Sequence, residues 1–340
     1  MTAAPPGPAS ATVRLDDPGF AEALMAWIGD LADGLAVSEG QRDLLRLARA
    51  ELAAKERSNR EVFGCSLFGT LPAAIFEAVA PGRLVPIALP AASSLCFLAL
   101  DILDDLADGD WPAHWGDRRP AEMELTGVLI LSVLVPEALA RATEDPALLA
   151  ALGAIHRQSL LRMADGQRED LAAADPADWD VSWDLATARR VLTARGPDQA
   201  SGYAAMAAVL AGAPPEAARH LADYAHHLTA AASLWSDLAE LLGPEGRDLK
   251  QGKRTVPLAA HVSALATSER AAFLARLAAA RTSEAEREAL RRELRASHAV
   301  AAAMAYRTID LAMARAALER AGLSDPERLS GFIEAVAGLG

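Results

Sequence analysis

The chain has 340 residues, of which 52% are hydrophobic, and it carries a formal net charge of −13. A surface this acidic repels phosphate groups, which argues against nucleic acid or an anionic membrane surface as the main partner. The most hydrophobic stretch, GVLILSVLV at 127–135, is shorter than the roughly 20 residues of a bilayer-spanning helix. Both cysteines stand in apolar surroundings, without metal or disulfide spacing. We therefore expect a cytoplasmic protein with no stable membrane insertion.

Alanine, leucine, arginine and glutamate dominate the composition, β-branched runs are scarce, and apolar residues recur with helical spacing almost throughout. The sequence therefore predicts an all-α fold. Residues 1–17 are rich in proline and alanine and predict a disordered tail, whereas no linker divides residues 18–340, which we expect to form one domain. The predicted helices span residues 18–35, 38–56, 60–79, 87–108, 119–142, 146–173, 181–195, 199–213, 215–242, 255–265, 269–280, 284–322 and 326–338.

The fourth predicted helix ends in a run of acidic residues, LALDILDDLADGD at 98–110. Side chains three and four residues apart share a helix face, so Asp101, Asp104, Asp105 and Asp108 form one stripe. Like charges at this spacing repel one another and weaken the helix. Mg²⁺ offsets such repulsion, since it is held by a few carboxylates together with phosphate oxygens of a substrate. Two interpretations stay open: a magnesium site on the last three aspartates, or a helix that ends in solvent.

A second charged segment, SLWSDLAELLGPEGRDLKQGKRTVP at 233–257, has a complementary pattern. Asp237 and Glu240 lie three residues apart near the end of a predicted helix, and Ser236 beside them offers a weaker oxygen ligand. The loop that follows is basic, and ammonium and guanidinium groups bind phosphate oxygens. Its cations are Arg247, Lys250, Lys253 and Arg254. Each half alone is ordinary surface charge, but the two together predict a diphosphate bound through metal ions and cations.

Five segments, in this order and spacing, resemble the trans-prenyl diphosphate synthases and the related class I terpene synthases. DDLAD at 104–108 resembles the first aspartate-rich motif of that family, and SDLAE at 236–240 stands where the second is expected. Between them, GQREDL at 166–171 and ASGYAAMAAVLAGA at 200–213 resemble family segments. DLKQGKRTVP at 248–257 matches the signature Asp-Leu-x-x-Gly-Lys-x-Thr-x-Pro. The resemblance implies an antiparallel helical bundle around a deep apolar cavity, a prenyl diphosphate substrate, Mg²⁺ as cofactor and a possible homodimer.

The chain departs from the chain-elongating members of that family in the pocket that binds isopentenyl diphosphate without metal. The family segment Gly-Lys-x-x-Arg-Pro is reduced to GTLP at 69–72 and PGR at 81–83, and Leu103 stands in place of a histidine. Arg118 and Arg119 are candidates for the family's arginine pair. Each lost charge-assisted hydrogen bond costs about 1.5–3 kcal/mol, whereas a metal-bridged diphosphate depends less on side-chain cations.

These departures favour a terpene synthase on a prenyl synthase scaffold. Such an enzyme ionises an allylic prenyl diphosphate, here of about C15–C20 or longer, and cyclises or quenches the cation. Two alternatives stay open: a trans-prenyl diphosphate synthase that condenses the allylic substrate with isopentenyl diphosphate, and a non-catalytic subunit that modifies a partner synthase. The degenerate SDLAE sequence motivates the last of these.

The resemblance also suggests residues that line the cavity. Ala99 and Leu100 stand where short-chain synthases of the family often have bulky aromatics, which implies room for a long chain. We expect Phe97 to limit the depth of the cavity and Trp235 to face the cation, because an aromatic ring attracts positive charge.

Overall fold

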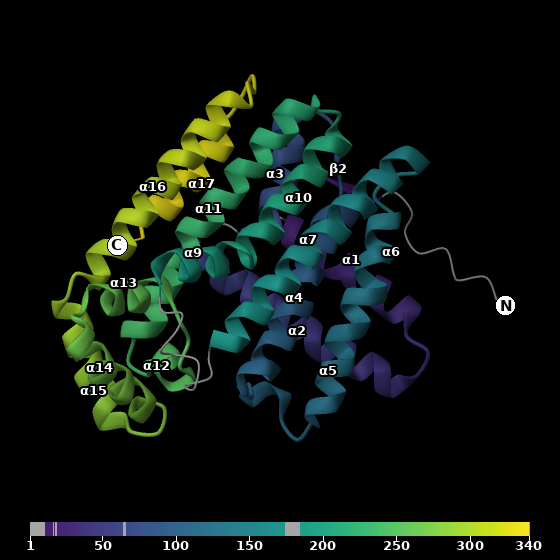
Figure 1. The fold of residues 1–340 in the computed structure, drawn as a ribbon. Helices are drawn as coiled ribbons and strands as arrows, with labels where there is room; N and C mark the ends of the chain where they lie inside the picture. Colours follow the sequence, from purple (N-terminus) through teal and green to yellow (C-terminus); the bar gives the residue numbers. More distant parts are fainter. Residues whose placement is uncertain (1–10, 16, 18, 64–65, 174–183, 340) are drawn as a thin grey trace. The chain divides into compact units, whose positions relative to one another are not determined.

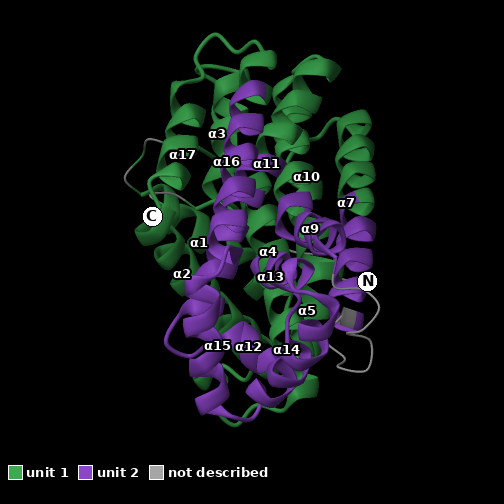
Figure 2. Ribbon diagram, turned by 60° about the vertical axis from the view of Figure 1, so that its left-hand side comes forward, with its two compact units in different colours: residues 1–158, 199–225, 317–340 green, residues 159–198, 226–316 purple. Residues whose placement is uncertain are grey.

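A computed structural model of the chain describes residues 11–15, 17, 19–63, 66–173 and 184–339. Their regular structure is almost entirely helical (Figure 1), which confirms the all-α prediction. The chain divides into two compact units, coloured separately in Figure 2. Unit 1 comprises residues 1–158, 199–225 and 317–340, and unit 2 comprises residues 159–198 and 226–316. That residues 18–340 form a single domain stays a prediction.

Unit 1 is built mainly from the N-terminal helices. Its elements are β1 (Thr12–Val13), α1 (Phe20–Leu35), α2 (Glu39–Phe63), α3 (Thr70–Val79), β2 (Val85–Pro86), α4 (Ala88–Asp108), the 3₁₀ helix η1 (Ala113–Trp115), α5 (Pro120–Leu129), the π-helical turn η2 (Ile130–Leu134), α6 (Val135–Ala140) and α17 (Glu327–Ala337). Four further helices contribute residues to both units: α7 (Pro146–Ala173), α10 (Gly196–Ala211), α11 (Pro215–Leu242) and α16 (Ala299–Arg320).

Helix α4 is the central helix of unit 1 and packs against α1, α2, α3, α5 and α6. Residues 88–99 are apolar or small on every side, and a helix of this composition is stable only when it is surrounded. Its neighbour α5 comes close at Gly127, where an added Cβ would lie 3.0 Å from Leu103 Cγ. The helix ends at Gly109, whose φ of 74° lets its N–H bond back to the carbonyl of Asp105. The packed core therefore fixes the position of the acidic end of α4.

The helical stretch from α5 through η2 to α6 falls within the helix predicted over 119–142 and extends well beyond the apolar run at 127–135. It runs over Pro120–Ala140, and its most apolar window has a mean hydropathy of 1.7 and is 44% buried. Its 21 residues are enough to cross a bilayer, so the length argument made from residues 127–135 is wrong. Length and composition alone are weak evidence for a membrane span, because the core helix of a soluble protein meets the same criteria.

The N-terminal segment is partly ordered, contrary to the predicted tail over residues 1–17. Strand β1 pairs antiparallel with β2, with Thr12 opposite Pro86 and Val13 opposite Val85. The N–H of Leu15 donates to Glu77 Oε1 at 2.8 Å. These hydrogen bonds anchor a segment that its composition alone classed as disordered. Residues 1–10 lie outside the described part of the chain.

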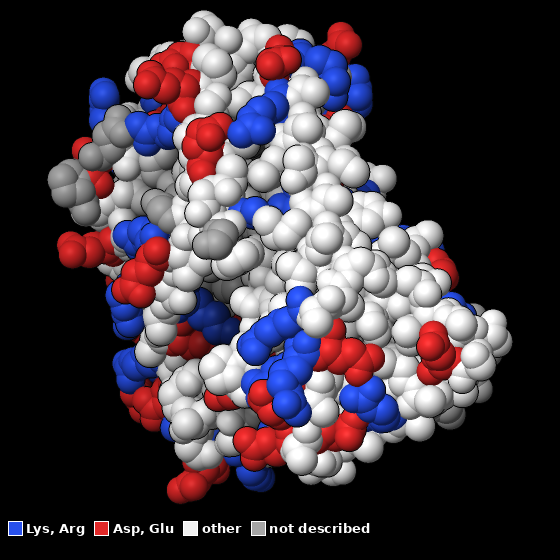
Figure 3. Space-filling view, turned by 90° about the vertical axis from the view of Figure 1, so that its left-hand side faces the viewer, with Lys and Arg blue, Asp and Glu red and all other residues white. Residues whose placement is uncertain are grey.

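Unit 2 has its own apolar core and several short helices. These are α9 (Leu185–Thr193), α12 (Arg247–Gln251), α13 (Val256–Ala264), α14 (Thr267–Ala280) and α15 (Glu284–Ala296). Helix α14 packs against α12 and α15, and α9 packs against α13. The core includes Leu234, Leu241, Leu249, Phe273 and Leu290. Among the described residues on the face drawn in Figure 3, acidic and basic side chains alternate in small groups, and no broad surface of one sign is formed.

Two local features of unit 2 differ from the sequence-based expectation. The helix predicted over 284–322 is interrupted at Ser297, whose backbone is extended and whose Oγ accepts the N–H of Ala299. A serine that bonds to a nearby backbone N–H in this way competes with helix continuation. The loop predicted over 243–257 contains α12, which Gly246 and Gly252 bound with φ of 55° and 77°. Both glycines adopt a left-handed conformation that other residues reach only with strain.

Candidate metal centres

The acidic end of α4 presents its aspartates in two groups rather than as one stripe. Asp105 is buried, with 8% of its surface exposed, whereas Asp104 and Asp108 are partly exposed. Asp101 lies one helical turn before Asp105, just as Asp104 lies one turn before Asp108. Of the three predicted metal ligands on this helix, two are therefore partly accessible and the third belongs to a buried cluster.

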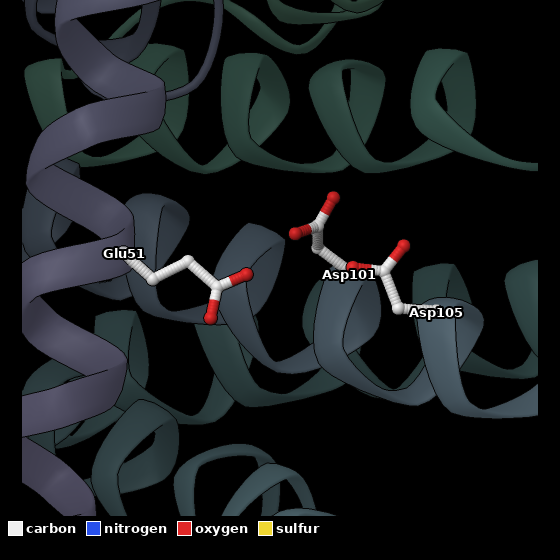
Figure 4. A group of neighbouring side chains, drawn as sticks. All are labelled: Glu51, Asp101 and Asp105. Carbon is white, nitrogen blue, oxygen red and sulfur yellow. The ribbon is translucent and has the colours of Figure 1, made fainter. Parts of the chain in front are cut away.

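That cluster, which we call the Glu51 cluster, consists of Glu51, Asp101 and Asp105 (Figure 4). Glu51 comes from α2 and the two aspartates come from α4, and one carboxylate oxygen of each lies within 4.8 Å of the others. Glu51 is only 3% exposed. Sequence reasoning missed Glu51, although its position between the buried Ala48 and Leu52 on α2 marks it as facing the core.

Donors from a neighbouring loop hold one oxygen of Glu51. The indole Nε1 of Trp115 donates to Glu51 Oε2 at 2.8 Å, and His114 Nε2 lies 3.1 Å from the same oxygen. Trp115 is buried and packs edge-on against Trp111, with ring centroids 5.0 Å apart. The loop between α4 and α5 is therefore attached to α2 through the acidic cluster.

Lys55, one turn after Glu51 on α2, forms an ion pair with Asp101. Burial alone would lower the pKa of Lys55, but the charges of Asp101, Asp105 and Glu51 raise it above its ordinary value. Burial raises the pKa of Asp101, and the ion pair with Lys55 offsets part of that shift. Lys55 was also missed from the sequence, because a lysine on an amphipathic helix gives no local signal of a partner on another helix.

Of the two segments expected to bind a second diphosphate in unit 1, PGR contributes the exposed Arg83, which donates to the carbonyl of Ala211 at 3.1 Å, and GTLP is apolar with an acid beside it. Leu71 and Pro72 of the GTLP segment are buried, and Phe68 just before it stacks on Phe97 with ring centroids 4.2 Å apart. An added Cβ at Gly69 would lie 2.9 Å from an oxygen of the buried Glu56. An acid beside this segment disfavours a bound anion, which agrees with the loss of cations read from the sequence.

The predicted cations after the first acidic motif are exposed. Arg118 lies at the surface, and Arg119 directs its guanidinium to Glu122, with Nη2 and Oε1 3.3 Å apart. The Arg119 N–H also donates to Glu122 Oε2 at 2.8 Å, which caps α5. Arg119 thus has a structural role at the helix start, and phosphate binding by this pair stays a prediction.

A second acidic group forms in unit 2 around residues of three motifs. Asp170, the aspartate of GQREDL, accepts a hydrogen bond from Arg195 Nη1 at 2.8 Å. Asp237 on α11 feels the charges of Asp170, Glu240 and Arg195. Arg195 is the cation that sequence reasoning missed, because it stands in a stretch, ARGPDQASG at 194–202, interpreted only as a helix break.

The charges in this group change the acidity of its members. Burial, together with repulsion from Glu240 and Asp170, raises the pKa of Asp237 to about 7, although Arg195 and Lys253 act in the opposite direction. Burial and the charges of Asp237 and Glu240 raise the pKa of Asp248 well above its usual range. The two cations therefore compensate the acids only in part.

The remaining predicted residues of the second motif differ in how far they are buried. Lys253 is partly buried, and its charge acts on Asp237 and Asp248. Binding of diphosphate by Lys253 stays a prediction. Arg254 is buried, and burial lowers its pKa despite the charges of Asp170, Asp184 and Glu169. Ser236 and Arg247 are partly exposed, and Lys250 is exposed.

The predicted cavity residues have other neighbours in the structure. Ala99 is fully buried, and its carbonyl oxygen would lie 3.4 Å from a Cβ at Gly127 of α5. Leu100 is partly exposed, and Phe97 stacks on Phe68 as described above. One face of Trp235 carries the guanidinium of Arg307, whose carbon lies 5.6 Å from the ring centroid. The role of these residues in a cavity stays a prediction.

The donor set of unit 2 fits a hard divalent cation. Carboxylate oxygens are the ligands that Mg²⁺ prefers, and burial together with repulsion among these carboxylates raises the pKa of Asp237 and Asp248. Asp248 is 2% exposed, and its Oδ2 has no hydrogen-bond partner among the described residues. A cation would relieve both features. That the acids of unit 2 face Asp104 and Asp108 of unit 1 stays a prediction.

The fold is that of solved prenyl diphosphate synthases. A geranylgeranyl pyrophosphate synthase from Corynebacterium glutamicum, solved with isoprenyl diphosphate and magnesium, matches with a TM-score of 0.77 and 18% identity over 96% of this chain and 99% of that chain. A geranylgeranyl pyrophosphate synthetase from Pyrococcus horikoshii Ot3 matches with a TM-score of 0.74 and 18% identity, over 94% and 95% of the two chains. A decaprenyl diphosphate synthase from Rhodobacter capsulatus gives 0.74 and 18%, over 94% and 96%.

At these identities the likeness establishes the fold, and at that level it confirms the resemblance drawn from the motifs. No family model matches the chain. No curated protein matches it either.

Proposed function

We propose that this chain is a Mg²⁺-dependent isoprenoid synthase that ionises an allylic prenyl diphosphate. The observation that carries the proposal is the charged group of unit 2, in which Asp237, Glu240 and Asp248 gather with Lys253 and Arg195. Its acids stay incompletely compensated, as a site for cations and a phosphate ester requires. The fold supports the same conclusion, because its solved members are named as synthases of prenyl diphosphates.

In this proposal the acidic residues bind the metal ions, and the basic residues bind the diphosphate. Asp104 and Asp108 of unit 1, with Asp105 as a predicted third member, and Asp237, Glu240 and Ser236 of unit 2 would hold Mg²⁺. Bound Mg²⁺ supplies positive charge that stabilises diphosphate as a leaving group.

In the ionisation step the C–O bond breaks and its electron pair stays on the diphosphate oxygen. Lys253 donates hydrogen bonds to the oxygens on which negative charge grows, with Arg254 or Arg247 beside it. Arg195 holds Asp170 and places a further positive charge near Asp237. Apolar side chains around the prenyl chain exclude water until the cation has reacted.

Two reactions of the allylic cation are candidates, and different observations favour them. The named activities of the structural neighbours favour transfer to isopentenyl diphosphate, which makes the chain a trans-prenyl diphosphate synthase. The residues of unit 1 favour the single-substrate reaction of a terpene synthase, because the GTLP segment lies beside a phenylalanine stack and Glu56 and itself contains no cation. In both cases the ionisation step is the same.

The proposal is tested by incubating the purified chain with Mg²⁺ and geranyl, farnesyl or geranylgeranyl diphosphate, with and without isopentenyl diphosphate. A longer prenyl diphosphate formed only with isopentenyl diphosphate identifies a prenyl synthase. Hydrocarbons or alcohols released without it identify a terpene synthase. If neither forms alone but turnover appears after mixing with a partner synthase, the chain is a modifying subunit, the alternative that the SDLAE sequence suggests. Release of no diphosphate under all these conditions contradicts the proposal.

A further inference from the structure

We propose that the Glu51 cluster binds a hard divalent cation in the interior of unit 1, at a site distinct from Asp104 and Asp108. Its ligands are the carboxylates of Glu51 and Asp101 together with that of Asp105. Glu51 and Asp101 lie outside every motif that links the chain to the prenyl synthases. The inference does not depend on the proposed function, since cation binding is measured without substrate.

The spacing of the three carboxylates suits one ion. Their ligand oxygens all lie within 4.8 Å of one another. Oxygens that surround a single cation at about 2.1–2.5 Å are separated by no more than about 4–5 Å. Figure 4 shows the side chain of Glu51 reaching from α2 toward the two aspartates of α4. Carboxylates brought together by two packed helices are thus already at ligand spacing.

One buried carboxylate oxygen of this cluster has no hydrogen-bond partner among the described residues. Glu51 is 3% exposed, and its Oε1 has no hydrogen-bond partner among the described residues, although Oε2 accepts from Trp115. A buried carboxylate oxygen that lacks a partner is costly, because it has lost its water and gained nothing in exchange. A cation bound to Oε1 supplies the missing interaction.

The charges in the cluster leave room for a divalent ion. Three carboxylates surround one lysine ammonium, so acidic groups outnumber basic ones among these four side chains, and a divalent cation would offset the excess. Lys55 pairs with Asp101, and its side chain is 35% exposed, so it can turn toward solvent when an ion arrives. Lys55 and the cation therefore compete for Asp101. Removing Lys55 should for this reason increase the affinity for the cation.

Indole next to the cluster supplies a direct spectroscopic readout. Trp115 Nε1 lies 2.8 Å from Glu51 Oε2, and energy transfer from an excited indole to bound Tb³⁺ falls steeply with distance. The experiment uses the full chain in a background with Asp104→Asn, Asp108→Asn, Asp237→Asn, Glu240→Gln and Asp248→Asn, which removes the other acidic groups expected to bind a cation. Tb³⁺ emission under tryptophan excitation and Mn²⁺ binding by electron paramagnetic resonance are measured, with Mg²⁺ and Ca²⁺ as competitors.

Three variants in this background separate a cation site from a structural network. Glu51→Gln should weaken Mn²⁺ binding at least tenfold and remove the Tb³⁺ emission. Lys55→Met should tighten binding severalfold, because the internal competitor is gone while the aliphatic packing stays. Glu56→Gln is the matched control: it neutralises another buried glutamate of α2, whose partner is Ser94, and should change affinity less than twofold.

The two variants are expected to change the affinity in opposite directions, weaker in Glu51→Gln and tighter in Lys55→Met. Misfolding could explain weaker binding but not tighter binding. If Glu51→Gln loses its native circular dichroism, Lys55→Met alone decides. No Mn²⁺ binding by the background protein, unchanged affinity in Glu51→Gln, or unchanged or weaker affinity in Lys55→Met would each overturn the proposal. The cluster would then be a network neutralised by Lys55 and the loop donors.

Discussion

The two acidic clusters of this chain balance their charge in different ways. In unit 1, Glu51 and Asp101 have specific partners, with Trp115 and His114 on the glutamate and Lys55 on the aspartate. In unit 2, Arg195 pairs with Asp170, while the pKa of Asp237 stays raised to about 7. Both clusters therefore contain acids that a cation would compensate, and they differ in the basic groups already beside them, which are Lys55 in unit 1 and Arg195 and Lys253 in unit 2. We expect substrate binding at the second cluster, because Lys253, a predicted diphosphate ligand, lies close enough to act on its acids.

The position of each cluster in the sequence supports the same distinction. The acids of unit 2 lie on segments that resemble family motifs, at 166–171, 236–240 and 248–257. The Glu51 cluster combines one residue of such a motif, Asp105, with two residues that belong to none. Resemblance therefore leads to the cluster in unit 2, whereas the Glu51 cluster is found only from the structure.

The largest expected effect concerns Asp104, the partly exposed aspartate of unit 1 that we assign to Mg²⁺. Asp104→Asn should reduce kcat/KM for the allylic diphosphate by about 10²–10³ or more, since it removes charge that holds the ion at the reacting bond. Asp110→Asn, a nearby aspartate beyond the end of α4, is the matched control and should stay within threefold. Wild-type rates in the Asp104 variant would remove the end of α4 from the mechanism.

Lys253 tests the substrate role of unit 2. Lys253→Gln should lower kcat/KM by about 10- to 100-fold, because a charge-assisted hydrogen bond is worth roughly 1.5–3 kcal/mol. Lys250→Gln removes the same charge from an exposed position on α12 and should change the rate less than twofold. Steady-state kinetics at saturating Mg²⁺ measure both. Equal losses of kcat/KM in the two variants would mean that the loop acts only through its total positive charge and not through a specific contact of Lys253.

The pH dependence of stability tests the uncompensated charge of Asp237. Its pKa is raised from the usual 3.8 to about 7, so the native state binds a proton that the unfolded state releases. Stability of the metal-free protein should therefore fall as pH rises from about 4 to 7. Asp237→Asn should be more stable than wild type at pH 8, by on the order of 1 kcal/mol, and equally stable near pH 4. Thermal unfolding in chelator at both pH values measures the difference. A variant that is less stable at pH 8 would show that Asp237 is compensated.

The smallest effect concerns the end of α4 rather than its charges. Gly109 has a φ of 74° and no atom within 4 Å of the position that a Cβ would take. Gly109→Ala should therefore cost about 1 kcal/mol through backbone strain alone. Gly40→Ala in α2 also meets open space, at an ordinary φ, and should be neutral or slightly stabilising. Urea unfolding compares them. Equal stability of the two variants would mean that this end of α4 is not held as described.

Local patterns in the sequence were sufficient for much of the helical structure. The predicted helices over 146–173 and 215–242 coincide with α7 and α11, because proline marks each start and helical periodicity continues without interruption. The prediction failed where a short-range hydrogen bond competed with the helix, at Ser297, and where two left-handed glycines enclosed a short helix, α12. Such features depend on single residues, which periodicity averages away.

The sequence by itself determined the helical class, the acidic and basic segments and the order in which they resemble a known family, because these are properties of neighbouring residues. Only the tertiary structure decided which charges meet. Glu51 reaches Asp101 and Asp105 because α2 packs against α4, and Arg195 reaches Asp170 from another helix. Helical periodicity predicts which side of a helix is buried. The partner on that side is chosen by packing between helices that lie far apart in the chain.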